Sequence, residues 1–365
     1  MVSMTEIIRL LEEWLPIPEN HDELEQWTLA ADEIVYAFDL SDSQQAYMDT
    51  IIDMYEEQFK AMMQQRQGPV VSKEQLDELL SRKQTEQRTE AWYKQMSTII
   101  SASELGNLFS SPYARSKFVV AKTLPYQQRQ QHLAVPSSHM SAFDWGIRFE
   151  PVVKLIYEHL HGNTIRELGR MIHPIDPRCA ASPDGLIYET GRLIEIKCPV
   201  TREIDGIIPK DYYHQMQMQL HVTGLHTCEY VEASFSSAYN KEPVKEGPPC
   251  PYYYGSIALV RYAEIKAGQE FYYAYGPVNC DEWVPMIDVD EDIIEIIPWR
   301  LYQWSEQVVH KSEEWWRTTH ELIEEFWRDV EKHKQGEFTV LESTRPTKKQ
   351  KPSESKCMIT FNRLD

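Results

Sequence analysis

Apolar residues recur at every third or fourth position through most of residues 1–83, the spacing of a helix that buries one face. Three segments follow this pattern: "TEIIRLLEEWL", "SDSQQAYMDTIIDMYEEQFKAMMQQ" and "SKEQLDELLSRK". Each opens on a residue that can cap a helix, with Thr5 as the expected cap of the first. The pattern predicts a helical N-terminal extension, for which a structural role is favoured over a catalytic one.

Helical spacing returns between Phe149 and Leu160, and this segment stops at Gly162. Pro151 predicts that the helix begins or kinks there, which would place Glu150 near a helix N-terminus. "DYYHQMQMQLHVTG" is expected to form another helix that ends at its glycine. The tryptophan-rich residues 299–334 are expected to form one long amphipathic helix.

The pattern between these helices is that of strands. "CEYVEASFSS", "YYYGSIALVRYAEI" and "QEFYYAYGPV" are rich in β-branched and aromatic residues. "ETG" supplies a turn before "RLIEIKC", so these residues predict a hairpin. Strands interspersed with helices indicate an α/β fold.

The strand "LIEIKC" carries two charges. Its period of two sends Leu193, Glu195 and Lys197 to one face and the apolar residues between them to the other. If the first face is even partly buried, a carboxylate and an ammonium there need partners. Asp184, in the preceding Ser-Pro-Asp-Gly segment, can approach Glu195 across the hairpin.

Two neighbouring carboxylates repel each other unless a cation lies between them. Oxygen ligands suit Mg²⁺ or Mn²⁺, and Lys197 could position or deprotonate a water beside the metal. This pattern indicates metal-assisted phosphodiester hydrolysis. Ordinary turn chemistry at Asp184 and solvated charge at Glu195 and Lys197 are the alternatives that the pattern alone leaves open.

The composition of the 365 residues, 42% hydrophobic and 26% charged, is ordinary for a globular protein. No apolar run approaches the roughly 18 residues of a membrane span, and the acidic start resembles neither a signal nor a transit peptide. The six cysteines include no C-x-x-C pair, which argues against a zinc ribbon. An intracellular setting, cytoplasmic or nuclear, is therefore expected.

The net charge of −20 superficially argues against a polyanionic partner. Residues 1–80, however, hold 18 acidic and 4 basic side chains. Because the acidic residues are concentrated in this first part, the charge of the whole chain does not exclude DNA as a partner of the middle part.

Four motifs in order resemble the lambda-exonuclease-like (YqaJ-type viral recombinase) branch of the PD-(D/E)XK nucleases, over residues 88–235. They are "RTEAWYKQMSTIISASELG", "WGIRFEP", "SPDGL" with "LIEIKCP", and "YYHQMQMQLHVTG". The resemblance implies a restriction-endonuclease-like core, with a central mixed β-sheet flanked by helices. It also implies a DNA exonuclease that uses Mg²⁺, with Mn²⁺ as a substitute.

The resemblance assigns roles residue by residue. Asp184, Glu195, the Ile196 carbonyl and Glu150 would bind the metal, and Lys197 would orient or activate the water. Gln215, backed by Tyr212, would contact the scissile phosphate. Ser103 would lie at a pocket for the terminal phosphate, and Trp92 in the opening motif would contact substrate. Gln217 and Gln219 are expected to lie on a polar helix surface.

One position departs from the family. Met96 stands where the family usually carries an arginine that holds a 5′-phosphate. Arg88, Lys94, Arg115 and Lys117 are candidates to compensate. The departure leaves 5′-phosphate dependence and the polarity of degradation open.

These observations divide the chain into a helical extension (1–83), a nuclease domain (84–334) and a basic tail (335–365). The favoured function is hydrolysis of double-stranded DNA from an end, 5′ to 3′, in recombination, repair or viral DNA processing. A structure-specific or nicking endonuclease and a catalytically inactive DNA-binding protein are the alternatives. The family also implies a trimeric ring and a single-strand annealing protein as a partner.

Overall fold

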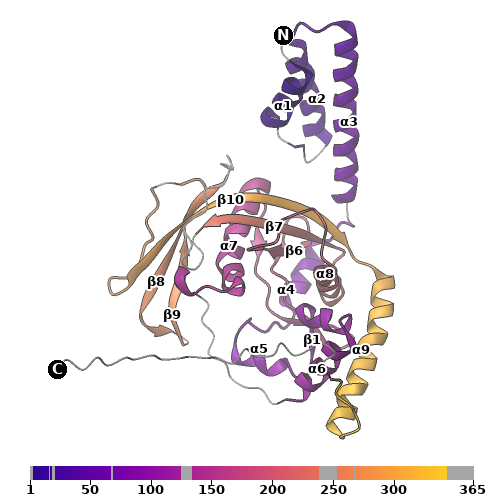
Figure 1. Cartoon of the computed structure of the whole chain (residues 1–365), viewed down its shortest axis with the longest axis vertical. Helices are drawn as coiled ribbons and strands as arrows, with labels where there is room; N and C mark the ends of the chain where they lie inside the picture. Colours follow the sequence, from indigo (N-terminus) through magenta and orange to yellow (C-terminus); the bar gives the residue numbers. More distant parts are fainter. Residues whose placement is uncertain are drawn as a thin grey trace, which may run out of the picture.

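The chain begins with a unit of three helices. A computed structural model describes residues 3–342 except 16, 19–20, 67–68, 125–133, 238–252, 267 and 281. The helices are α1 (Met4–Trp14), α2 (His21–Tyr36) and α3 (Asp42–Arg66), in indigo and violet at the top of Figure 1. Their apolar faces bury a core of their own. Ser3, and not Thr5, caps α1, because Ser3 and Glu6 form a reciprocal capping box.

A seven-stranded mixed sheet forms the centre of the molecule (Figure 1). Among the described strands of this sheet, β6 and β7 are the one parallel pair and the other neighbouring pairs are antiparallel. In spatial order the strands are β2 (Ile165–Arg166), β5 (Gly185–Ile187), β6 (Arg192–Lys197), β7 (Thr227–Ser237), β10 (Asp292–His310), β8 (Tyr254–Lys266) and β9 (Gln269–Tyr275). A smaller sheet has the order β1 (Ile100–Ser101), β4 (Cys179–Ala181) and β3 (Met171–Ile172).

Helices cover both faces of the large sheet. Leu193 of β6 is buried in one core with residues of α8, α9 and α6, whereas Ile194 and Ile196 are buried in a second core with α7. This alternation confirms the predicted fold class, a mixed sheet flanked by helices with further helices before it. The helices that follow α3 are α4 (Lys73–Ser81), α5 (Glu90–Gln95), α6 (Pro112–Thr123), α7 (Ala142–His161), α8 (Lys210–Thr223) and α9 (Glu313–Lys334), with the 3₁₀ segments η1 (Ala102–Leu108) and η2 (Ser137–His139).

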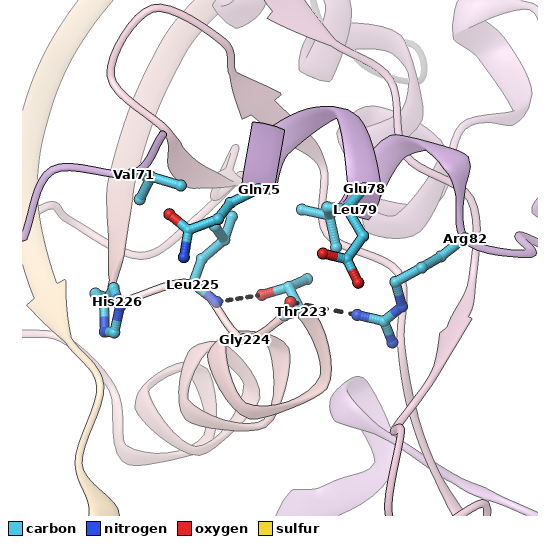
Figure 2. Close-up of a pocket in the computed structure, with 9 residues that line it drawn as sticks. All are labelled: Val71, Gln75, Glu78, Leu79, Arg82, Thr223, Gly224, Leu225 and His226. Carbon is cyan, nitrogen blue, oxygen red and sulfur yellow. Dashed lines mark hydrogen bonds between the residues drawn. The ribbon is translucent and has the colours of Figure 1, made fainter. Parts of the chain in front are cut away.

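Helix α4 packs against the end of α8. Its Leu76 and Leu79 belong to the core beneath the large sheet and not to the core of the N-terminal helices. Arg82 then donates from Nη1 to the Thr223 carbonyl (3.2 Å) and from Nη2 to the Ile172 carbonyl (2.9 Å). Figure 2 shows Arg82 reaching the last turn of α8 beside a small pocket. The guanidinium therefore satisfies a carbonyl at a helix C-terminus.

The helix predicted for 299–334 is wrong in its first part. Residues 292–310 form β10, and the helix begins only after its N-cap, Ser312. Trp299 and Leu301 are buried two positions apart, which is strand periodicity. β10 pairs with β7 on one side and β8 on the other, and these long-range hydrogen bonds decide the conformation.

The predicted start of the helix around Glu150 is also wrong. Helix α7 begins at Ala142, because Ser141 and Asp144 form a capping box two turns before Pro151. Pro151 lies inside the helix, so Glu150 projects from its middle. Trp145 and Phe149 anchor the extra turns in the core.

The residues outside the description include most of the predicted basic tail, from 343 onward. The four cysteines that are described, Cys179, Cys198, Cys228 and Cys280, are free thiols. Among the described helices, none is both long and apolar enough to cross a membrane.

Candidate active site

The β5–β6 hairpin brings Asp184 and Glu195 together. Gly185 pairs with Ile194, and Asp184 directly precedes β5. The Ile196 N–H donates to Asp184 Oδ2 (2.8 Å). A Cβ at position 185 would lie 2.4 Å from the Ile165 side chain, so the glycine after Asp184 serves close packing between strands.

The same hydrogen bond orients the Ile196 carbonyl. In a strand, the N–H and C=O of one residue point toward the same neighbour. The pairing of β5 with β6 extends no further than Gly185 and Ile194, so the Ile196 backbone on this side meets the Asp184 side chain. Its carbonyl therefore lies on the side of β6 that Asp184 occupies.

Glu195 is fully buried, and both of its carboxylate oxygens are held. Gln215 donates to Oε1 and Gln219 to Oε2, each at 2.6 Å, and the Lys197 ammonium contacts Oε1. The two glutamines are four residues apart and lie on one face of α8. Helix α8 thus forms a clamp over the carboxylate.

The expectation that Gln217 and Gln219 lie on a polar surface is wrong. Both are fully buried. Gln217 donates to the His310 carbonyl (2.7 Å) and accepts from the Ser312 N–H (2.8 Å), which ties α8 to the junction of β10 and α9. The intervening Met216, Met218 and Leu220, also buried, were the sequence signal that the second half of this helix is covered on every side.

The charges of the site perturb one another. Burial, followed by the charges of Glu195 and Glu150, raises the pKa of Asp184 well above its usual value. Burial lowers the pKa of Lys197, but the adjacent Glu195 and Asp184 outweigh it and the pKa is raised. Lys197 is therefore an ammonium, and its nitrogen lies 4.7 Å from the centre of the Tyr212 ring.

Asp184, Glu150 and Lys197 line an open pocket of ≈380 Å³, and the fully buried Glu195 lies behind them. Glu150 reaches it from α7, where it also pairs with Lys154 (2.9 Å). Arg88 lines the pocket with a backbone φ of 64°, a conformation that is costly for a residue with a Cβ. The predicted residues along the pocket are Arg88, Glu150, Asp184, Ile196, Lys197 and Tyr212; Gln215 lies behind them on Glu195.

The other predicted substrate-binding residues lie outside the pocket lining. Arg115 of α6 pairs with Asp329 (2.8 Å) and Glu325 of α9, and Lys117 is exposed on α6. Ser103 is exposed at the start of η1, with its hydroxyl 3.3 Å from that of Ser101.

Trp92 and Met96 both contact Arg170, which the sequence reasoning missed. The Arg170 guanidinium stacks 3.8 Å from the Trp92 ring and donates to the Trp92 carbonyl (2.6 Å). It also contacts Met96 Sδ (3.1 Å), and the Met96 carbonyl accepts from Lys122 (2.6 Å). Two buried cations therefore lie against the position where the family usually carries an arginine.

The atoms at this site that could bind a metal ion are all oxygens. Within the described residues, no three His, Cys, Asp or Glu side chains are grouped so that they could hold a metal ion by themselves. Asp184 and Glu195 supply two carboxylates and Ile196 a carbonyl. Such a set fits Mg²⁺, which binds through one or two carboxylates and retains several waters.

Residues 91–226 match the YqaJ-like viral recombinase domain. This segment is similar to the YqaJ-like viral recombinase domain. It contains Glu150, Asp184, Glu195, Lys197 and Gln215, so the site described above lies within the matched segment.

An uncharacterised protein of Acanthamoeba polyphaga mimivirus is 26% identical over 197 residues, which cover 48% of this chain and 34% of that relative. Among solved structures, an alkaline exonuclease from Laribacter hongkongensis is similar with 18% identity and a TM-score of 0.43, covering 68% of this chain and 95% of that one. A phage-related exonuclease from Haemophilus somnus 129PT is similar with 10% identity and a TM-score of 0.38, covering 65% and 96%.

Proposed function

We propose that this protein is a metal-dependent nuclease that hydrolyses double-stranded DNA from an end. One observation carries the proposal. A fully buried Glu195, held by Lys197, Gln215 and Gln219, stands beside Asp184 at an open pocket. Burying charge in this way is costly, and a pocket carboxylate with a strongly raised pKa, as at Asp184, is typical of catalytic sites.

Mg²⁺, or Mn²⁺ in its place, would supply Lewis-acid activation of phosphate and water at this site. The groups that would hold it are Asp184, Glu195, the Ile196 carbonyl and, directly or through water, Glu150. Lys197, which contacts Glu195 at the pocket, would donate to the scissile phosphate or orient or activate the attacking water. Gln215 fixes the Glu195 oxygen that faces Lys197.

The biological role proposed is DNA recombination, repair or viral DNA processing, which the description of the matched domain supports. A 5′-to-3′ direction, a trimeric ring and an annealing partner extend the proposal from the family resemblance. Light scattering on the purified protein tests the trimer.

A second candidate is an endonuclease on the same site. Its support is the placement of Ser103, Arg115 and Lys117 outside the pocket, since these residues were expected to hold a terminal phosphate. Covalently closed circular DNA separates the two functions. Cleavage of the circle at the rate of linear duplex would contradict end dependence, and 5′-phosphate and 5′-hydroxyl duplexes test recognition of the end.

The Lys197→Ala variant tests the site itself. We expect Mg²⁺-dependent cleavage to fall by at least about 100-fold, because the charge that faces the phosphate is lost. Binding of duplex DNA with EDTA present should persist. A time course with labelled duplex, with and without EDTA, measures both. Wild-type cleavage in the variant would contradict the assignment of Lys197.

A further inference from the structure

A second buried carboxylate lies beside the site. Glu232 of β7 is fully buried and is the register partner of Lys197 across the parallel β6–β7 pair. Register partners project to the same face of a sheet, so Glu232 lies on the face that carries Glu195 and Lys197. A buried carboxylate destabilises the folded protein unless it is paired and hydrogen-bonded.

Glu232 is paired at one oxygen. The Arg202 guanidinium contacts Oε1, and the Tyr230 hydroxyl donates to the same oxygen (2.6 Å). Within the described residues, the buried Oε2 has no hydrogen-bond partner. The sheet thus retains an incompletely satisfied carboxylate whose main contact is one arginine.

Arg202 lines the same pocket as Asp184, Lys197 and Tyr212. Its side chain is 36% exposed, whereas its partner Glu232 is inaccessible. Besides the contact with Glu232, the described residues offer it only a long bond of 3.4 Å from Nη1 to the Glu203 carbonyl. A guanidinium has five N–H groups, so several remain for a ligand in the pocket.

The chemistry of such a ligand follows from the guanidinium. The guanidinium is planar, and its contact with a buried carboxylate fixes its orientation. Two of its N–H groups can then donate to two oxygens of one phosphate. A mobile surface lysine would supply charge without that orientation. Lys197 already provides a point charge at the carboxylates and Arg88 also lines the pocket; Arg202 adds a cation whose orientation is fixed by a buried carboxylate.

We propose that Arg202 binds a backbone phosphate of the DNA beside the scissile bond, and that Glu232 and Tyr230 position its guanidinium. The inference rests on the nuclease function proposed above. It adds a substrate-binding residue and two positioning residues.

The experiment compares Arg202→Ala, Arg202→Lys and Glu232→Gln in the full chain. We expect Arg202→Ala to raise the KM for duplex DNA about tenfold and to reduce the slope of log K against log salt by about 0.9, the value of one lost phosphate contact. Arg202→Lys should restore the slope but only part of the KM. Glu232→Gln should raise KM less than Arg202→Ala, and the double variant should be no worse than Arg202→Ala.

Arg261→Ala is the matched control. This arginine of β8 is similarly exposed and forms ion pairs with Glu270 of β9 and Asp292 of β10, outside the pocket lining. Circular dichroism and thermal unfolding check that each variant is folded, and Arg202→Lys carries the test if Arg202→Ala is not. Equal KM and equal salt slopes for the Arg202 variants and Arg261→Ala would overturn the inference. Absence of any cleavage by wild type with Mg²⁺ or Mn²⁺ would instead overturn the nuclease function.

Discussion

At the scale of single residues, the site depends on how each buried charge is satisfied. Glu195 receives three donors, and each comes from a different position on β6 or α8. A buried acceptor that loses its partner costs more than the bond itself contributed, because the group is left without water. The glutamines of α8 therefore affect both the stability of the protein and the position of the carboxylate.

Gln219→Leu tests this double effect. The variant leaves Glu195 Oε2 without a donor, so we expect the free energy of unfolding to fall by about 1–3 kcal/mol. We also expect the Mg²⁺ concentration for half-maximal cleavage to rise about tenfold, because the carboxylate is no longer held. Urea denaturation and a metal titration of cleavage measure the two effects.

Gln217→Leu is the control for that variant. It is buried on the same helix but bonds the β10–α9 junction. It should lower stability without changing the metal requirement. A similar metal shift in both variants would mean that the helix as a whole, and not the bond to Glu195, sets the requirement.

A second residue, His173, predicts a dependence of stability on pH. Burial chiefly lowers its pKa from 6.5 to about 4, and its Nδ1 accepts from the Ile175 and Asp176 N–H groups. Between these two pH values the unfolded chain binds more protons than the folded protein. The free energy of unfolding should therefore fall as the pH is lowered from 6.5 to 4, by about 3 kcal/mol at most from this group.

His173→Asn keeps an acceptor but cannot be protonated, so it should lose this part of the pH dependence. Urea unfolding at pH 7 and pH 4.5 measures the difference. His139→Asn, at an exposed histidine, should behave like wild type. If the free energy of unfolding of His173→Asn depends on pH as in wild type, other titratable groups cause that dependence.

At the scale of elements, α4 supports α8 from its C-terminal end. Arg82 joins α4 to the Thr223 carbonyl (Figure 2) and to the Ile172 carbonyl. Arg82→Ala removes two charge-assisted bonds, and we expect it to destabilise the protein by about 1–3 kcal/mol. Arg317→Ala, at an exposed position of α9, should stay within about 0.5 kcal/mol of wild type. Thermal unfolding of both variants measures these losses of stability. Equal losses in the two variants would mean that the Arg82 hydrogen bonds do not stabilise the protein.

Helices and turns whose conformation depends on residues close by in the sequence could be predicted. The "ETG" hairpin and the helix that ends at Gly224 formed as expected, because turn and cap residues act locally. Residues 299–310 could not be assigned in this way, since two neighbouring strands impose the extended conformation.

The same distinction applies to the site. Asp184 and Glu195 were predictable from one hairpin and a family resemblance. The contact between Arg202 and Glu232 depends on the register of β7 against β6, which no local pattern encodes. Gln219 could have been found only by noticing that apolar residues surround the glutamines of α8.

At the scale of the whole molecule, the three N-terminal helices have a core separate from the two cores of the sheet. Trp27 is central to it and packs on Tyr55 and Phe59 at 5.7 and 5.1 Å between ring centres. Trp27→Ala should destabilise this core by about 3–5 kcal/mol and leave the cleavage rate within about twofold of wild type. Calorimetry and the cleavage assay measure these effects. A large loss of cleavage would show that the helices take part in catalysis.

The length of β10 has a mechanical consequence. This one strand pairs with β8 over Asp292–Arg300 and with β7 over Trp299–His310, so the two ladders overlap at two residues. Each ladder has a register shift, between Ile293 and Glu295 toward β8 and between Leu301 and Gln303 toward β7, and neither shift lies in the overlap. A hinge at Trp299 and Arg300 would therefore have to break backbone hydrogen bonds to both neighbouring strands. The ribbon should therefore be held firmly to the catalytic strands at this overlap, and a force applied at its tip would be transmitted through β10 to β7, the strand that carries Glu232.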